Sequence, residues 1–141
     1  MYIYVNIILQ QDKKKGVIQM IEVKGKYNLA KIFSDKIDEK LLIPINMRDG
    51  SILAIGKGNE DWNYSAPHGA GRLMSRSEAK SKLNINEFEN SMKDIWTTSV
   101  CEETIDEAPM AYKSIDDILK FIGHTVEIID VIKPIYNYKS K

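Results

Sequence analysis

Cysteine and histidine are scarce in this chain of 141 residues, which contains one cysteine, Cys101, and two histidines, His68 and His124. A single cysteine excludes an internal disulfide framework and is typical of a protein from a reducing compartment. One cysteine and two histidines cannot make a four-ligand zinc site without help from carboxylates. We therefore expect no metal site built from these side chains.

Net charge and long hydrophobic runs are also lacking. Lysine plus arginine and aspartate plus glutamate number 20 each, for a formal net charge of +0. This balance excludes a broad basic face for nucleic acid and leaves only a local anion site. The longest apolar stretch, residues 1–9, contains Asn6 and falls far short of the roughly 18 residues that a transmembrane helix needs. Because lysines 13–15 follow this stretch instead of preceding it, it is a poor signal peptide, and we expect a soluble cytoplasmic protein without a membrane partner.

The chain does contain enough apolar sequence, 43% of its residues, for one packed domain. Short strand-like and helix-like segments alternate without an internal repeat, which predicts an α+β fold. Strands are expected at residues 2–9, in two pieces within 20–33, at 41–47, at 51–58 after an Asp49-Gly50 turn, and at 125–132. Helices are expected for about one turn from Lys36, over 71–82, from 85 behind an Asn84–Glu87 capping box, and over 115–122 between Ser114 and Gly123.

The segment with the clearest chemistry is SAPHGAGRLMSRSEAK, residues 65–80. Gly69 and Gly71 allow a sharp turn, and a helix predicted to begin there would direct backbone N–H groups and its positive dipole end into one concavity. Arg72 and Arg76, four residues apart, would share a helical face beside it. These features predict a phosphate site with His68 at its edge, where an imidazole can act as a general acid, a general base or a nucleophile on phosphorus.

Spacing alone leaves simpler interpretations open. A histidine before a glycine-rich turn is more often a loop residue with a satisfied hydrogen bond. The two arginines could equally belong to a solvated helix face.

The string SAPHGAGRLMSR strongly resembles the signature of the RtcB family, GTP-dependent ligases that join RNA 3′-phosphate or 2′,3′-cyclic phosphate ends to 5′-hydroxyl ends. The resemblance continues through LLIPINMRDGSILAIGKGN (41–59), DEAPMAYK (106–113) and KPIYNYK (133–139). Roughly two thirds of the chain thus resembles the C-terminal part of such a ligase. The resemblance implies that residues 41–141 form a nucleotide-binding part with an RtcB-like fold.

The resemblance also implies a role for individual residues. His68 matches the histidine that attacks the α-phosphorus of GTP and becomes guanylylated, after which GMP passes to the RNA 3′-phosphate and is displaced by the 5′-hydroxyl. Arg72 and Arg76 match arginines that handle substrate phosphates, Lys139 matches a lysine that contacts guanine, and Tyr112 is expected to stack on the base. The residues expected to line the GMP pocket are Pro44, Ile45, Asn46, Met47, Ser51, Gly69, Ala70 and Gly71.

The metal site of the family has no counterpart in the sequence. These ligases hold divalent metal ions, typically Mn²⁺, on Asp, Cys and His side chains from regions upstream of the matching part. Cys101 lies downstream of the signature, and His124 falls at a helix-to-strand junction where a surface position is expected. GTP or GMP and Mn²⁺ are thus the expected cofactors, with the Mn²⁺ ligands missing and a partner chain as one possible source of them.

The first 40 residues suggest how the metal-binding part of the family came to be missing. Residues 20–40 resemble the extreme N-terminus of the same family and join directly to residue 41. We interpret the chain as an internally deleted ligase, with residues 1–19 as an extension and 1–40 as a remnant preceding the nucleotide-binding part. Three hypotheses follow: an RNA ligase that uses a partner's metals, a non-catalytic module that binds GMP or an RNA end, and an inert fragment.

Overall fold

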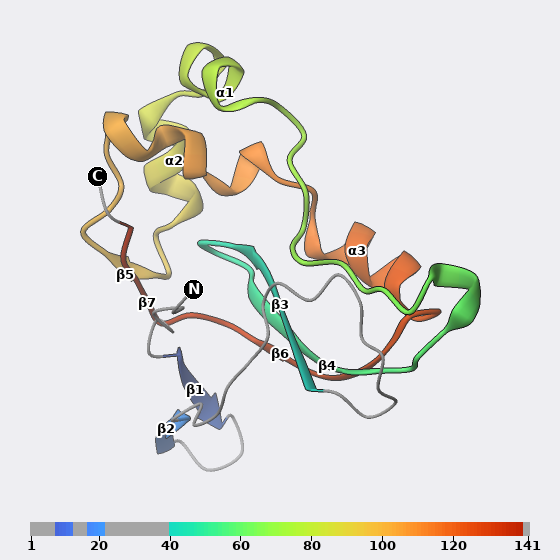
Figure 1. Cartoon of the computed structure of the whole chain (residues 1–141). Coiled ribbons are helices and arrows are strands. Elements are labelled where there is room, and N and C mark those ends of the chain that lie inside the picture. The colour runs from blue at the N-terminus through green and yellow to red at the C-terminus, as the bar shows by residue number, and fades with distance from the viewer. Residues whose placement is uncertain (1–7, 13–16, 22–39, 140–141) are drawn as a thin grey trace.

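The computed structural model describes residues 8–12, 17–21 and 40–139, and it contains both helices and strands, which confirms the α+β prediction. Figure 1 shows their arrangement. The strands are β1 (Ile8–Asp12), β2 (Val17–Ile21), β3 (Lys40–Asn46), β4 (Gly50–Gly56), β5 (Trp96–Thr97), β6 (Val126–Ile132) and β7 (Tyr136–Asn137). The helices are α1 (Arg76–Lys82), α2 (Ile85–Ser91) and α3 (Ile115–Ile122), with 3₁₀ turns at Glu60–Trp62, Glu102–Glu107 and Pro109–Ala111.

The central sheet has the order β3-β4-β6, and both pairings are antiparallel. As an edge strand, β3 tolerates Pro44, which cannot donate to a ladder on its free side. The β3–β4 turn is closed by Asn46, whose side-chain oxygen accepts hydrogen bonds from the backbone N–H groups of Arg48 and Asp49. Gly50 follows with a φ of 82°, and any Cβ there would collide with the backbone oxygen of Ile132. The turn therefore requires glycine and lies against the end of β6.

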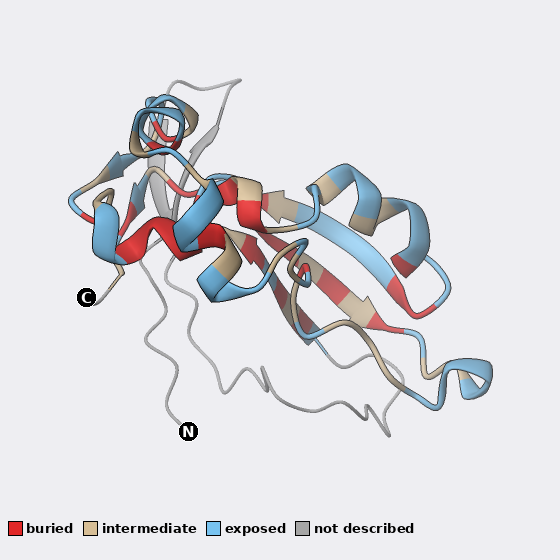
Figure 2. Ribbon diagram, turned by 90° about the horizontal axis from the view of Figure 1, so that it is seen from above, coloured by how far each residue is buried: buried red, intermediate tan, exposed pale blue. Residues whose placement is uncertain are grey.

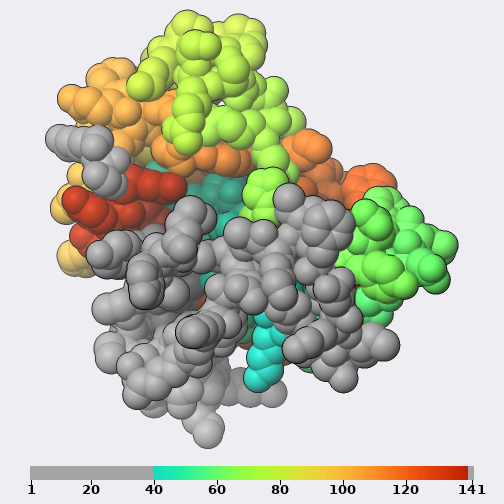
Figure 3. Space-filling view, viewed as in Figure 1, coloured from blue at the N-terminus to red at the C-terminus, as the bar shows by residue number. Residues whose placement is uncertain are grey.

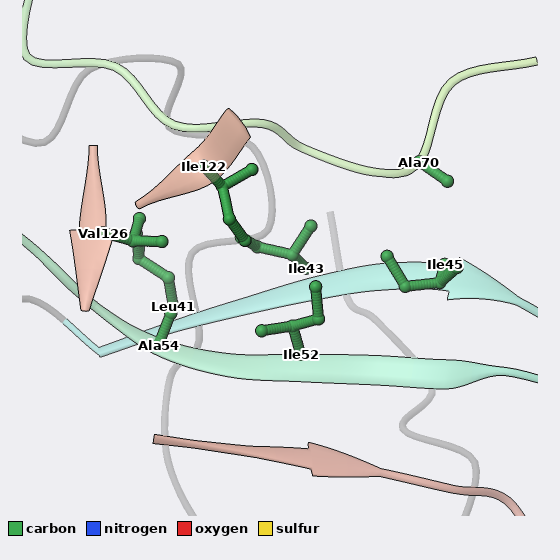
Figure 4. Packing of buried hydrophobic residues seen from close by; sticks show 8 residues of the cluster. All are labelled: Leu41, Ile43, Ile45, Ile52, Ala54, Ala70, Ile122 and Val126. Carbon is green, nitrogen blue, oxygen red and sulfur yellow. The ribbon is translucent and has the colours of Figure 1, made fainter. Parts of the chain in front are cut away.

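The first hydrophobic cluster lies between the sheet and α3 (Figures 1 and 4). Alternate residues of β3 point into it, and Ile122 of α3 meets them from the other side. Ser114 caps α3 by accepting a hydrogen bond from Asp117 N–H, as its sequence predicts. The buried members are Leu41, Ile43, Ile45, Ile52, Ala54, Ala70, Ile122 and Val126.

A second cluster lies at the other end of the sheet, beneath α1 and α2 (Figure 1). Phe88 of α2 is fully buried there with Met92, Ile105 and Ala108. Met47, from the β3–β4 turn, belongs to the same cluster. Figure 2 shows the two resulting bands of buried residues, one along the sheet and one along the segment around residues 104–111. The hairpin turn therefore joins the two clusters, and whatever lies beside it is supported by both.

Several sequence predictions need correction. The helix predicted from Gly71 begins only at Arg76, because Ser75 is extended and its hydroxyl accepts the hydrogen bond of Glu78 N–H. Residues 71–75 are a loop. Asn84 does cap α2, but it accepts from Asn86 N–H. β1 runs on to Asp12, three residues beyond the strand expected at 2–9, and β2 starts at Val17, three residues before the strands expected within 20–33.

Some predictions fall outside the described residues. These are the strand expected over residues 2–7, most of the segment 20–33 and the helix expected at Lys36. The boundary at residue 40 stays a prediction. The strands predicted at 41–47, 51–58 and 125–132 and the helices at 85 and 115–122 are confirmed within about two residues at each end. Over the described ranges, no helix is long and apolar enough to cross a membrane.

Candidate functional site

A pocket of about 400 Å³ lies where the β3–β4 turn, the glycine-rich loop and the C-terminal strand meet. In Figure 3 the surface of the hairpin (teal) is recessed between the C-terminal residues (red) and the loop that follows His68 (yellow-green). This volume is within the range of small-molecule sites. The pocket is lined by Pro44, Ile45, Asn46, Met47, Gly50, Ser51, His68, Gly69, Ala70, Gly71, Arg72, Glu107, Tyr112, Pro134, Asn137 and Lys139.

Backbone hydrogen bonds hold the glycine-rich loop from both sides. Ala70 N–H donates to the carbonyl of Pro44 at 3.2 Å, which ties the loop to β3. Lys113 N–H donates to the carbonyl of Gly71 at 3.1 Å, within a short antiparallel bridge between Arg72 and Tyr112. Gly71 has a φ of 75°, which is unfavourable for a residue with a Cβ. The loop is thus held between β3 and the segment at Lys113, and it is not the first turn of a helix.

His68 lines this pocket and is exposed, whereas the loop residues on either side of it are half-buried. Within the described part of the chain, its imidazole makes no hydrogen bond that would explain it as a satisfied loop residue. An exposed imidazole without a partner among the described residues is what the nucleophile hypothesis requires.

The pocket wall opposite the hairpin is an ion-pair network around Glu107. One carboxylate oxygen accepts hydrogen bonds from Lys139 Nζ at 3.0 Å and from the Tyr112 hydroxyl at 2.8 Å. Burial raises the pKa of Glu107, but hydrogen bonds from Lys139 and Tyr112 outweigh it and leave the pKa below its usual value. Burial and the bond to Glu107 raise the pKa of Tyr112 to about 12. At neutral pH Glu107 is therefore a carboxylate and Tyr112 a neutral phenol.

Arg72 is fixed in the same network. Its guanidinium carbon lies 4.8 Å from the centre of the Tyr112 ring, a cation–π distance, and NH1 donates to the Tyr112 hydroxyl at 2.9 Å. Nε donates to Met74 O at 3.1 Å, and NH2 donates to the carbonyl of Asp106. Because the side chain is only 23% exposed, Arg72 is a preplaced positive charge at the pocket.

Arg76 is the one predicted site residue that does not line the pocket. It begins α1 and its side chain is 67% exposed, with NH1 2.6 Å from carboxylate oxygens of both Asp106 and Glu107. The prediction that Arg72 and Arg76 share a helical face is wrong, because the chain between them is a non-helical loop and α1 begins only at Arg76. The prediction of a helix N-terminus at the glycine-rich turn is wrong for the same reason.

Sequence reasoning missed two polar residues of the pocket, Glu107 and Asn137. Glu107 lies in the DEAPMAYK segment, in which the resemblance points only to Tyr112. Asn137 lies two residues before Lys139, and this strand-like spacing is the signal that could have placed both on one face.

Within the ranges that the structure describes, no group of three or more His, Cys, Asp and Glu side chains could hold a metal ion. Cys101 is half-buried, and His124 is an exposed residue whose ring stacks on Trp62 with centroids 6.4 Å apart. The described donors therefore do not fit the Mn²⁺ site that the family resemblance implies.

Known proteins resemble this chain over most of its length, including the pocket residues. The family model described as tRNA-splicing ligase RtcB matches residues 13–140. The RNA-splicing ligase RtcB of Escherichia coli K12 is 35% identical over 99 residues, which cover 70% of this chain and 24% of that protein. The tRNA-splicing ligase RtcB of Aeropyrum pernix is 37% identical over 109 residues, covering 74% of this chain and 22% of that protein. The chain spans about a quarter of the length of these relatives. Because the family model matches nearly all of the described residues, the chain belongs to the RtcB family of RNA ligases.

Proposed function

We propose that this chain is the guanine-nucleotide-binding part of an RtcB-type RNA ligase, and that its pocket holds GMP with the phosphate beside His68. One observation carries the proposal. The His68 imidazole, which has no partner among the described residues, and the fixed guanidinium of Arg72 lie in one pocket with the Tyr112 ring and the Lys139 amino group, which come from two other parts of the sequence.

The lining residues suit the parts of a nucleotide. Arg72 can neutralise phosphate oxygens, and glycines at 69 and 71 let the backbone approach the phosphate closely. Tyr112 offers a ring on which a base can stack, and Lys139 is a donor for its edge. His68 is the group that can bond to the α-phosphorus of GTP. In that step the N–P bond forms, the bond to pyrophosphate breaks with its electron pair, and the imidazole loses its proton.

Joining RNA ends would need metal ligands that the described residues do not supply. Because the described donors form no metal site, we assign no metal-dependent step to this chain. The proposal is that a second polypeptide provides the metal ligands, and that the RNA 3′-phosphate end meets the guanylate at the junction.

A labelled-nucleotide experiment tests this function. The full chain is titrated with GMP by calorimetry and incubated with GTP labelled at the α-phosphate, with and without Mn²⁺. We expect saturable GMP binding, weakened in Arg72→Ala and retained in the control His124→Ala, and no acid-labile adduct. No GMP binding by a folded chain would refute the proposal. An adduct that disappears in His68→Ala would refute the claim that the metal ligands must come from elsewhere.

The inert-fragment hypothesis has one observation in its favour. Ile128 and Ile129 on β6 are 39% and 54% exposed, which is the apolar surface expected of a strand that lost its neighbour. Thermal unfolding without a cooperative transition, together with no GMP binding, would support that hypothesis.

A further inference from the structure

The C-terminal strand presents alternate faces to the pocket and to solvent. Tyr136 and Tyr138 are exposed, whereas Asn137 is buried and Lys139 is half-buried. Both Asn137 and Lys139 line the pocket. This period of two is that of an extended chain, so the two polar side chains lie on the one face of the segment that faces the pocket.

The side chain of Asn137 has a buried oxygen without a hydrogen-bond partner among the described residues. The residue is 7% exposed, and among the described residues its side-chain oxygen is the one buried side-chain polar atom without a hydrogen-bond partner. Buried acceptors in native proteins are nearly always paired, because an unpaired one costs free energy. Lys139, on the same face, already donates to Glu107 and can donate to a ligand with its remaining N–H groups. The pocket thus carries a lone acceptor beside a strong donor.

We propose that Asn137 sets the preference of this pocket for guanine over adenine, an inference that rests on the proposed function. Guanine presents the O6 acceptor next to the N1–H and N2–H₂ donors, whereas adenine presents a donor at N6 next to the N1 acceptor. The Asn137 oxygen accepts from the N1–H and N2–H₂ edge, while Lys139 donates to O6. Adenine would place its N1 acceptor against the Asn137 oxygen and its amino group against the ammonium.

The test compares Asn137→Leu with the wild-type chain and with Tyr138→Phe, a control on the exposed face of the same segment. Dissociation constants for GMP and AMP are measured by calorimetry, and melting temperatures are measured without nucleotide. Wild type and Tyr138→Phe should prefer GMP by about tenfold or more. Asn137→Leu should lose about tenfold in GMP affinity without any loss of AMP affinity, since the oxygen that opposes adenine N1 is gone. It should melt at a higher temperature because an unpaired polar group has been replaced by an apolar one of similar size.

A lower GMP affinity together with a higher melting temperature distinguishes a role of Asn137 in recognition from a role in stability. Equal weakening of GMP and AMP binding in Asn137→Leu, or an unchanged preference for GMP, would overturn the inference and leave the proposed function standing. Failure of the wild-type chain to bind GMP would overturn both. Asn137→Asp, which keeps the acceptor, is expected to retain the preference, and loss of the preference there would also contradict the role assigned to the oxygen.

Discussion

Arg72 and Arg76 lie four residues apart in the same motif, yet they belong to two different regions of the molecule. The loop that carries Arg72 is bound to β3 and to residues 111–113 through its backbone, and its guanidinium lies in the pocket wall. The helix that begins at Arg76 is defined by its own cap, and its first side chain lies outside the pocket against Asp106. Spacing along the chain therefore does not decide which arginine meets a ligand. The backbone between them does.

The largest expected effect comes from removing the two arginines separately. Arg72→Ala deletes bonds to two backbone carbonyls and a phenol, and we expect a loss of about 2–3 kcal/mol in the free energy of unfolding and a GMP affinity lower by about tenfold or more. Arg76→Ala removes the ion pairs that a 67% exposed side chain makes with Asp106 and Glu107. A loss of at most about 1 kcal/mol is expected, with GMP binding unchanged. Urea denaturation and calorimetric titration give both quantities.

Arg72→Lys sharpens this result. Lysine keeps the charge but lacks the forked donors, so we expect an intermediate loss of affinity. If Arg76→Ala weakened GMP binding as much as Arg72→Ala, Arg76 would have to reach the nucleotide, and the division between the two regions would be wrong.

The next effect concerns the backbone of the loop. Gly71 has a positive φ, and the space around it is open, since a Cβ would lie 3.9 Å from the nearest atom, Lys113 Cε. Gly71→Ala should therefore cost about 1–2 kcal/mol through backbone conformation alone and weaken GMP binding as the loop shifts.

Gly123→Ala is the matched control. Gly123 has helical angles and nothing within 4 Å of its Cβ position. Alanine there should be neutral or stabilising by up to about 1 kcal/mol. Equal destabilisation by the two substitutions, measured by urea denaturation, would contradict the argument from φ.

The same contrast explains what the sequence could and could not predict. The alternation in β3, the turn at Asp49-Gly50 and the cap at Ser114 are local signals, and the elements that they predict are confirmed. The helix start at residue 71 was wrong because the loop is held by Pro44 and Lys113, partners far away in the sequence.

The candidate pocket shows the same limit. The family resemblance predicted its wall from the hairpin, the glycine-rich loop, Tyr112 and Lys139, and these residues do meet at one pocket. Glu107 and Asn137 lie in two of the resembling segments, but the resemblance gives neither of them a role. The position of Glu107 depends on how the segment around residues 104–111 packs, which no local pattern contains, whereas the spacing of Asn137 and Lys139 was a usable signal.

A smaller effect on stability is expected from the N-terminal cap of α1, the second of the two regions. Ser75→Ala removes the hydroxyl that accepts from Glu78 N–H, and we expect a loss of about 1 kcal/mol in stability without a change in GMP affinity. Ser75→Asp, which retains an acceptor at the cap, should restore most of the stability. A drop in GMP affinity in Ser75→Ala would show that the cap also positions the loop.

The smallest expected effect concerns Glu107, whose carboxylate pairs with both regions, 3.7 Å from Arg72 NH1 and 2.6 Å from Arg76 NH1. Its pKa is lowered in the folded chain relative to the usual value of 4.5, so its carboxylate stabilises the fold above that pH, and this contribution is lost as the pH falls through the folded pKa. Gln at this position does not titrate but can still accept from Tyr112. Urea denaturation from pH 7 to 3 should therefore show wild type losing its advantage over Glu107→Gln only below about pH 4.5. A constant difference across the range would mean that Glu107 acts through its shape, and its ionic link between the two regions would then contribute nothing to stability.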